Sequence, residues 1–389
     1  MCRNVCFVVT DAVSFNVLYR GQLEYLVGEG FALTMICGGS AEELERLRAR
    51  NVGRLVDVGL VRTPSLFADG TSLIRLIWHF LFNRYDLVLT STPKALLLAS
   101  IAACFTMQRR RVAFFQGRVY ENFRGLRRRI YRLFDRATVA CVHEVLFVSR
   151  SLMSEFVNEM PTAETKGRVL GDGSGNGICS QTFSHDAVPL ERVEEIRREL
   201  GLLASDFVIL VVGRICADKG LVEIEQVADR LVDSGAKLVL VGPPEGEKAA
   251  SFLKRLVASK VVRHVPFTRD VVSYFALANA HLFLSHREGF GNVAIEAAAM
   301  GVPTIAFDVV GVRDSVGDGV SGIRVDFGDV DAVAMILRGM MDDREGTLNR
   351  FVHARQWALE RFSRERVWAE FAEFYRGAQP ANKQSESYG

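Results

Sequence analysis

Two glutamates in the C-terminal half of the chain flank a short glycine-containing segment. Glu288 stands just before residues 289–292 and Glu296 follows within one further turn. The apolar run at 280–284 predicts a strand before them, and residues 293–300 predict a helix that ends at Gly301 and Pro303. Asn292 has the side chain of an N-cap. The pattern therefore predicts a loop that leads from a buried strand into a helix N-terminus.

Such a loop is a place where open α/β sheets bind phosphate, because exposed amides and the helix dipole favour negative charge. A carboxylate beside a phosphate is unfavourable, so we expect Glu288 and Glu296 to point at hydroxyl groups instead. Two such carboxylates suit a ligand with a sugar at one end and a ribose at the other. On spacing alone, a plain strand–loop–helix connection with two solvated glutamates explains the segment equally well.

A second segment, residues 211–220, offers two cations after a predicted strand. The strand ends at Val212, Gly213 opens the turn, and Asp218 is a candidate N-cap for a helix that begins at Lys219. Arg214 and Lys219 would project from the carboxyl end of the sheet, where they could neutralise a diphosphate and the charge that develops as it leaves. Alone, this segment would predict only two surface cations. Together with the glutamate segment, it favours a site that binds a diphosphate.

Short apolar runs alternate with helical patterns along the whole chain, as parallel strands buried on both faces and their crossover helices do. The runs predict strands at 5–10, 32–37, 87–90, 111–115, 144–148, 207–212, 237–241, 280–284 and 304–307. The length of 389 residues suits about two domains. The glycine-rich segment at 171–177 lies between the two series, which places the junction near 176–192. The polar tail from Ala378 is expected to be disordered.

The composition is that of a globular protein with an uneven charge distribution. Residues 1–190 carry 23 Lys and Arg against 17 Asp and Glu, a net +6, whereas the remainder carries 25 against 29, a net −4. The N-terminal half should therefore prefer an anionic partner. The seven cysteines are scattered without zinc-ligand spacing and are interpreted as buried thiols of a reducing compartment. With no secretory signal and no apolar run long enough to span a membrane, the sequence predicts a cytoplasmic protein.

The excess of positive charge concentrates between Arg109 and Arg136, where ten arginines face Glu121 and Asp135. Apolar residues repeat there at helical spacing, namely Leu126, Ile130, Leu133 and Ala137, and the arginines around them are Arg127, Arg128, Arg129 and Arg132. One interpretation is an amphipathic helix that lies on anionic lipid. Another is a helix that packs its apolar stripe on the sheet with a basic outer face. Nucleic-acid binding is the weaker reading, because no recognised module accompanies the charge.

Several of these motifs together resemble the Glu-x7-Glu retaining glycosyltransferases of family GT4, which have the GT-B fold of two doubly wound, Rossmann-like α/β domains. The resemblance rests on Gly213-Arg214, Lys219-Gly220, Glu288-Gly289-Phe290-Gly291-Asn292 and Glu296, with Gly311, Asp314, Gly319 and Gly322 in support. In the N-terminal half, Thr92-Pro93-Lys94, residues 111–121, residues 145–152 and Ser174-Gly175-Asn176-Gly177 are also similar. The pattern is most similar to bacterial members that assemble surface polysaccharides on lipid carriers.

The resemblance implies an acceptor-binding domain at 1–185, a donor-binding domain at 186–365, and a helix within 366–389 that crosses back to the N-terminal domain, with Trp357 and Trp368 packing at the junction. Glu288 would bind sugar hydroxyls and Glu296 the ribose diol, while Arg214, Lys219 and the 289–292 amides hold the diphosphate. The implied donor site comprises Gly213, Arg214, Lys219, Val265, Pro266, Phe267, Glu288, Gly289, Phe290, Gly291, Asn292, Val293 and Glu296, of which Val265–Phe267 would recognise the base.

The implied reaction transfers a hexose or N-acetylhexosamine with retention from a nucleotide sugar, typically a UDP-sugar, to a lipid-linked saccharide at the inner face of the plasma membrane. Phe15, Gln116, Gly117 and Arg118 would lie on the acceptor or sugar side. Gln116 stands where relatives commonly have histidine, so it could hydrogen-bond but not carry a proton. Asp314 replaces a glutamate, and residues 11–15 replace a glycine-rich loop.

No cofactor or metal is expected. Asp329 and Asp331 match an Asp-x-Asp metal motif, but Asp329 reads better as the N-cap of a helix. Two other functions remain open from the sequence. One is a UDP-sugar epimerase or phosphorylase on the same fold, although no additional acid and base residues are identifiable. The other is a non-catalytic subunit that binds a nucleotide sugar.

Overall fold

The computed structural model describes residues 3–118, 120 and 123–377. The chain forms two compact units, which we name unit 1 (residues 1–176 and 365–389) and unit 2 (residues 177–364). The chain leaves unit 1 at Asn176, inside the glycine-rich segment and before the boundary expected at 185. Cys2, Glu121 and the tail from Ala378 lie outside the described residues.

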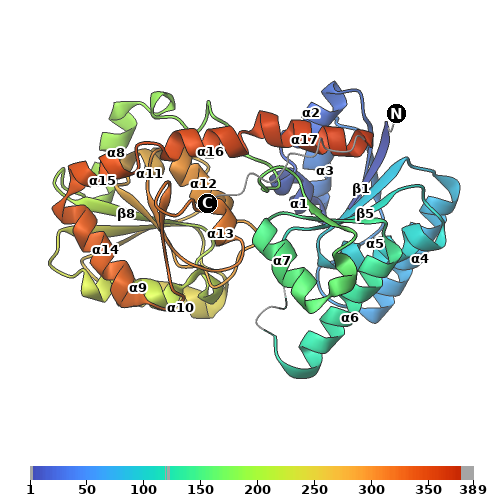
Figure 1. Cartoon of the computed structure of the whole chain (residues 1–389), viewed down its shortest axis with the longest axis horizontal. Helices are drawn as coiled ribbons and strands as arrows, with labels where there is room; N and C mark the ends of the chain where they lie inside the picture. The colour runs from blue at the N-terminus through green and yellow to red at the C-terminus, as the bar shows by residue number, and fades with distance from the viewer. Residues whose placement is uncertain (1–2, 119, 121–122, 378–389) are drawn as a thin grey trace. The chain divides into compact units, whose positions relative to one another are not determined.

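Unit 1 is built on a parallel sheet of seven strands in the order β3-β2-β1-β4-β5-β6-β7 (Figure 1). Its strands are β1 (Asn4–Asp11), β2 (Ala32–Gly38), β3 (Arg54–Asp57), β4 (Leu87–Ser91), β5 (Arg111–Phe115), β6 (Glu144–Phe147) and β7 (Gly167–Val169). Its helices are α1 (Ala12–Leu18), α2 (Gln22–Gly28), α3 (Ala41–Ala49), α4 (Leu66–Phe82), α5 (Pro93–Phe105), α6 (Gly125–Cys141), α7 (Arg150–Glu159) and α17 (Arg364–Arg376).

Alternate residues of the central strand β1 face two different helical layers, as the pleat of a strand requires. Cys6 and Val8 belong to the core beneath α4 and α5. Phe7 points the other way, where its ring meets Tyr375 of α17 at 5.5 Å between centroids. The unit 1 sheet is therefore buried on both faces, which explains why its central strands are continuous apolar runs.

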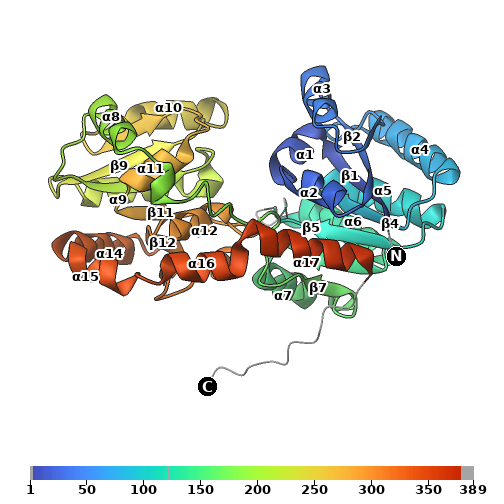
Figure 2. The same ribbon diagram turned by 90° about the horizontal axis from the view of Figure 1, so that it is seen from above.

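Helix α17 comes last in the chain and packs on unit 1. Its Trp368 lies against Gly21 at the start of α2, and the indole nitrogen donates to the Asn176 side chain at 2.8 Å. Figure 2 shows α17, in red, beside α2. Trp357 lies instead in α16 of unit 2, where its ring meets Phe362.

Unit 2 has a parallel sheet of six strands in the order β10-β9-β8-β11-β12-β13. Its strands are β8 (Phe207–Val212), β9 (Ala236–Val241), β10 (Val262–Val265), β11 (Ala280–Phe283), β12 (Thr304–Phe307) and β13 (Gly322–Val325). Its helices are α8 (Leu190–Leu200), α9 (Leu221–Arg230), α10 (Gly246–Leu256), α11 (Val271–Leu277), α12 (Asn292–Ala299), α13 (Val312–Ser315), α14 (Val330–Asp342), α15 (Arg344–Arg350) and α16 (Ala354–Phe362).

Both units are thus doubly wound α/β sheets, as predicted. In the described part of the chain, no helix combines the length and the apolar character that a membrane crossing needs. The described cysteines are all free thiols. Cys6 and Cys37 are buried as predicted, whereas the prediction of burial is wrong for the partly exposed Cys104, Cys141, Cys179 and Cys216.

The two carboxylates of the Asp-Val-Asp motif both have local partners. Asp329 caps α14, since its side chain accepts a hydrogen bond from the Ala332 amide at 2.9 Å. The Asp331 carboxylate receives the Arg230 guanidinium at 2.6 Å. The predicted N-cap at Asp329 is confirmed.

Replacing Asp329 with alanine should lower the free energy of unfolding by about 1 kcal/mol, because the first turn of α14 loses its cap. Asp329→Asn should keep most of the stability, since asparagine caps nearly as well. Urea unfolding followed by circular dichroism measures both. A loss as large in the asparagine variant as in the alanine variant would contradict the capping role.

Candidate functional site

The candidate donor site lies in unit 2, at the point where the order of the sheet reverses. Strands β8 and β11 are parallel neighbours, and the chain runs from β8 to β9 on one side but from β11 to β12 on the other. The loops after β8 and β11 therefore leave the same edge of the sheet in opposite directions. That switch point is where open α/β sheets bind ligands.

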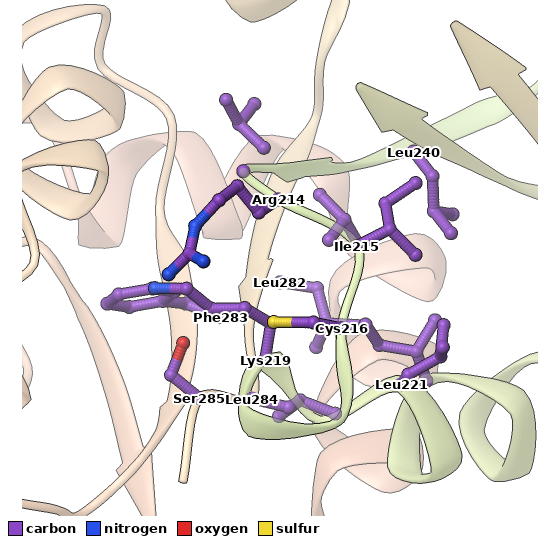
Figure 3. Close-up of a pocket in the computed structure, with 14 residues that line it drawn as sticks. Arg214, Ile215, Cys216, Lys219, Leu221, Leu240, Leu282, Phe283, Leu284 and Ser285 are labelled. Atoms are coloured by element: carbon purple, nitrogen blue, oxygen red, sulfur yellow. The ribbon is translucent and has the colours of Figure 1, made fainter. Parts of the chain in front are cut away.

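A small pocket opens between the ends of these two strands (Figure 3). Its floor is apolar, with Leu282 and Phe283 of β11, and its polar side chains include Arg214, Lys219 and Ser285. Ser285 is buried, and its hydroxyl has no hydrogen-bond partner among the described residues. Ser285 was not among the predicted site residues, although its position as a polar residue directly after a predicted buried strand was the available signal.

The structure brings together two of the predicted residues, Lys219 and Glu288. The Lys219 ammonium and the Glu288 carboxylate form an ion pair, and the ammonium lies 5.8 Å from the centroid of the Phe283 ring. The Glu288 side chain is only 14% exposed. Because partial burial weakens screening by water, the direct Coulombic attraction between these two charges is stronger than between fully exposed ones.

Two glycines allow the loops around this ion pair to come close. Gly220 has φ +74° and lies so near Leu284 that a Cβ atom would collide with its backbone. Gly311, after β12, has φ +80°, and a Cβ atom there would lie 2.6 Å from the Glu288 carbonyl oxygen. The Glu288 backbone is thus held against the loop that follows β12, while its carboxylate meets Lys219 from the loop after β8.

Helix α12 begins one residue earlier than expected. Gly291 is its N-cap, with φ +92°, and Asn292 is its first helical residue, so the predicted Asn292 cap is wrong. A side chain at residue 291 would lie 2.9 Å from the Phe283 ring, which explains why glycine takes the cap position. Phe290 is buried, with its ring 5.2 Å from that of Phe362, so a ligand could meet its backbone rather than its ring.

Glu296 lies within α12 and has no hydrogen-bond partner for its carboxylate among the contacts of the described residues. Part of the side chain reaches solvent, yet protein surrounds the carboxyl group, and this desolvation raises its pKa to about 7. A carboxyl group in this state gains from any ligand that donates hydrogen bonds to it. Its perturbed pKa is a further sign of a functional position.

Arg214 is held apart from the Lys219–Glu288 pair by a partner of its own. Its guanidinium pairs with Glu245 at 2.5 Å, and both side chains are exposed. Asp218 does not cap a helix as predicted: it lies in the 3-10 turn Ala217–Lys219, its carboxylate receives Arg287 at 2.6 Å, and Gly220 caps α9. Sequence reasoning did not identify the charged partners Glu245 and Arg287.

The predicted base-recognition residues lie at the same edge of the sheet. Val265 ends β10, and its carbonyl oxygen accepts the Gly242 amide at 2.9 Å. Pro266 and Phe267 are exposed directly after it. His286, in the loop after β11, hydrogen-bonds Glu223 at 3.0 Å through Nε2.

Two of the predicted acceptor-side residues are placed differently by the structure. Phe15 is fully buried, with its ring 5.7 Å from that of Tyr19, so it belongs to the core of unit 1 and that prediction is wrong. The Arg118 side chain is 2% exposed and pairs with Glu155 and Glu159 of α7, at 2.7 and 3.2 Å. Its buried ion pairs hold α7 in place, so the Arg118 side chain is not presented to an acceptor.

Gln116 follows β5 and leads into Gly117, at the carboxyl edge of the unit 1 sheet. Its amide nitrogen donates to Ser91 at 3.0 Å and to the Tyr19 hydroxyl at 3.3 Å. The nearby Thr92 has φ +70°, an uncommon conformation for threonine, and its hydroxyl bonds that of Thr10 at 2.8 Å. These polar groups surround the ends of β1, β4 and β5.

The basic helix α6 does not pack its apolar stripe on the sheet. Leu126, Ile130 and Leu133 are all exposed, and only the second half of the helix is buried, at Thr138 and Val139. The alternative of an apolar stripe packed beneath a basic outer face is therefore wrong for this part of α6.

The four arginines expected to face a membrane divide into two pairs. Arg128 and Arg132 form ion pairs with Glu159 of α7, at 2.6 and 3.6 Å, and their side chains remain 43% and 36% exposed, so their membrane-facing role stays a prediction. Arg127, which lies 3.8 Å over the Phe123 ring, and Arg129 are exposed. Across the described residues, no group of three or more His, Cys, Asp or Glu side chains is arranged to hold a metal ion.

Two family models match this chain. Residues 19–173 match Glycosyltransferase Family 4, and residues 192–356 match Glycosyl transferases group 1. The capsular polysaccharide biosynthesis glycosyltransferase CapM of Staphylococcus aureus is 31% identical over 348 residues, which cover 88% of each chain. A D-inositol 3-phosphate glycosyltransferase of Geodermatophilus obscurus is 34% identical over 163 residues, covering 38% of this chain and 36% of that protein.

Solved glycosyltransferase structures share the fold. HepE from Anabaena, in complex with UDP and glucose, superposes with a TM-score of 0.78 at 18% identity, covering 96% of this chain and all of HepE. WaaG, a glycosyltransferase involved in lipopolysaccharide biosynthesis, gives a TM-score of 0.72 at 17% identity, with 96% and 100% coverage. With these matches and the two doubly wound units, the chain belongs to glycosyltransferase family 4 and is a glycosyltransferase of the GT-B fold.

Proposed function

We propose that this enzyme transfers a hexose or N-acetylhexosamine from a nucleotide sugar, with retention of configuration, to a lipid-linked or saccharide acceptor during assembly of a bacterial surface polysaccharide. The observation that carries the proposal is the meeting of Lys219 and Glu288 at the switch point, with Glu296 in the helix that follows. This edge offers a cation for a diphosphate and two carboxylates for hydroxyl groups.

The relatives support a UDP-sugar as donor and a surface polysaccharide as product. HepE was solved with UDP and glucose, and also with UDP-glucose. CapM acts in capsular polysaccharide biosynthesis. We therefore propose that uridine lies by Val265–Phe267, where the exposed Phe267 ring offers an apolar surface to a base.

The proposed chemistry needs positioning and charge stabilisation rather than a protein nucleophile. Lys219, Arg214 and the N-terminus of α12 would offset the charge that develops on the departing diphosphate. Glu288 would orient the sugar through its hydroxyls and Glu296 the ribose. The departing phosphate would help to deprotonate the acceptor. We propose no metal and no cofactor, because protein cations are available for the diphosphate.

The acceptor and the membrane would be met through unit 1. Gln116 and Gly117 stay proposed for the sugar or acceptor side. The exposed arginines Arg127 and Arg129 of α6 stand beside exposed leucines, an arrangement suited to an anionic surface with an apolar interior. We propose that the enzyme works at the inner face of the plasma membrane, peripherally bound.

Replacing Glu288 with glutamine should separate transfer from nucleotide binding. We expect transfer of radiolabelled sugar to membrane lipid extract to fall roughly 100-fold or more, because a hydroxyl contact is lost. UDP affinity, measured by calorimetry, should stay the same or tighten, since Lys219 is released from its ion pair.

Glu225→Gln is a matched control, because Glu225 pairs with Arg255 on the surface of the same unit. It should change neither quantity. A loss of UDP binding in Glu288→Gln equal to the loss of transfer would contradict a sugar-side role for Glu288.

Affinity for UDP-glucose should rise with pH through the pKa of Glu296, which is about 7. The ionised carboxylate accepts hydrogen bonds from both ribose hydroxyls, so its protonation below this pH weakens binding, by up to roughly tenfold between the two forms. The sugar diphosphate itself does not titrate in this range.

The same shift affects folding. Because the pKa of Glu296 is higher in the folded state than in the unfolded chain, its contribution to the free energy of unfolding is greatest below the ordinary glutamate pKa and is lost as the pH rises through about 7.

Calorimetric titrations at several pH values test this expectation, with Glu296→Gln as the comparison. The variant should bind UDP-glucose more weakly and with a flatter pH profile. An unchanged pH profile in the variant would rule out Glu296 as the titrating group.

Removing two exposed arginines of α6 should weaken binding to anionic vesicles. The double variant Arg127→Ala, Arg129→Ala loses about 1 kcal/mol of attraction per arginine, which is roughly tenfold or more in affinity. Co-sedimentation with phosphatidylglycerol vesicles measures it. Arg46→Ala, Arg48→Ala removes two exposed arginines of α3 and serves as the control. Equal binding by the two double variants would remove α6 from the membrane contact.

A further inference from the structure

Helix α4 of unit 1 carries apolar side chains on the face turned to solvent as well as on the face turned to the core. Its buried residues are Ser72, Leu76 and Phe80, which face the sheet. Its exposed positions are Leu66, Phe67, Gly70, Ile74, Arg75, Trp78, Leu81 and Phe82. A helix with large apolar side chains on its exposed face as well as its buried face gains from an apolar partner on the exposed face, which the fold of unit 1 does not supply.

The exposed residues form one stripe along the whole helix. Phe67, Ile74, Trp78 and Phe82 recur at spacings of seven, four and four, so they share a face. The rings of Trp78 and Phe82 stack with 5.6 Å between centroids, and their side chains are 57% and 75% exposed. We call this stripe the α4 apolar face.

The end of α5 extends the α4 apolar face. Arg84, just past α4, donates to the backbone carbonyls of Thr106 and Met107, which ties the two helix ends together. Phe105 and Met107 are both strongly exposed there. Large exposed apolar side chains gathered on two neighbouring helix ends are typical of an interaction site in soluble proteins.

The exposed charged residues at the α4 apolar face are arginines. Arg75 is the exposed charged residue within α4, and Arg84 and Arg109 border its C-terminal end, where Arg109 pairs with the partly buried Asp86 at 3.1 Å. Helix α5 contacts both α4 and α6, so the exposed Arg127 and Arg129 belong to the same helical layer (Figure 1). Aromatic side chains bordered by arginines are suited to the boundary between headgroups and acyl chains.

We propose that the α4 apolar face inserts into the acyl boundary of an anionic bilayer, as the apolar part of the membrane contact whose basic part is α6. The inference rests on the proposed membrane partner. A second copy of the chain fits less well, because a two-fold contact through this face would set the arginines of one copy against those of the other. An anionic bilayer satisfies the apolar stripe and its basic border together.

The test uses the full chain and vesicles of equal parts phosphatidylglycerol and phosphatidylcholine. The double variant Trp78→Ser, Phe82→Ser should bind these vesicles roughly tenfold more weakly, because two large apolar side chains are removed from the acyl region. This loss should persist in high salt, which screens only the arginine contribution. Met335→Ser, Leu348→Ser is the control, since these unit 2 residues are 69% and 66% exposed and apolar.

A second measurement uses the natural fluorescence of Trp78. Lipids brominated on the acyl chain should quench the wild-type protein more than Trp78→Phe, which keeps an aromatic ring and hence the packing. Equal quenching of the wild type and Trp78→Phe would overturn the proposal. Equal vesicle affinity of the wild type and the double variant Trp78→Ser, Phe82→Ser would also overturn it. So would a wild-type dimer in lipid-free buffer that Trp78→Ser, Phe82→Ser splits into monomers.

The outcomes separate the inference from the proposed function. If Arg127→Ala, Arg129→Ala loses vesicle binding while the Trp78 double variant keeps it, the α4 face is not inserted but the membrane partner stands. If the wild-type protein binds no vesicles in any salt, the membrane partner and the α4 inference both fail.

Discussion

Close contact between loop backbones at the carboxyl edge of the unit 2 sheet is the constraint on which the donor site depends. Gly220 lets the loop after β8 touch Leu284 after β11, and Gly311 lets the loop after β12 touch Glu288. A Cβ atom at either glycine would collide with the facing backbone, at 2.1 Å from the Leu284 oxygen or 2.6 Å from the Glu288 oxygen, so the loops would have to move apart. Lys219 directly precedes Gly220, and Glu288 is the residue that Gly311 touches. Moving the loops apart would therefore separate the Lys219 ammonium from the Glu288 carboxylate. The Lys219–Glu288 ion pair therefore depends on the close backbone contacts that the two glycines permit.

The charges of the unit 2 site are balanced within the protein. Lys219 is neutralised by Glu288 and Arg214 by Glu245, while burial favours the protonated form of Glu296 near neutral pH. A diphosphate would compete with Glu288 for Lys219, which would free the Glu288 carboxylate for the hydroxyls of the sugar. One ligand with phosphate and hydroxyl groups would thus satisfy both partners, whereas free phosphate would satisfy Lys219 alone. We expect this coupling to favour the intact donor.

The sequence predicted the central strands of both sheets well and the outermost strands poorly. The predicted runs matched β5, β8 and β12 to the residue, because a strand buried on both faces is a continuous apolar run. Four strands were not predicted, β3, β7, β10 and β13, and they are the outermost strands of the two sheets. Edge strands are short and partly exposed, so their pattern resembles that of a loop.

Site residues followed a similar division. The two segments taken together, with the resemblance to family GT4, selected Lys219 and Glu288, and the ends of neighbouring parallel strands do converge there. The burial of Phe15 and the ion pairs of Arg118 depend on tertiary contacts with residues far along the chain, such as Glu155 and Glu159, which no local pattern encodes. The exposed apolar face of α4 was not predicted from the sequence, because a segment rich in apolar residues is normally expected to be buried.

The most direct measurement of the central claim is release of nucleoside diphosphate from a panel of UDP-, GDP- and ADP-sugars, with and without membrane lipid extract. The account predicts release of UDP from a particular UDP-sugar, dependent on the extract and lost in Glu288→Gln. Nucleotide binding without release from any donor, in the presence of extract, would contradict the proposal that this edge of unit 2 carries out sugar transfer to a lipid-linked acceptor.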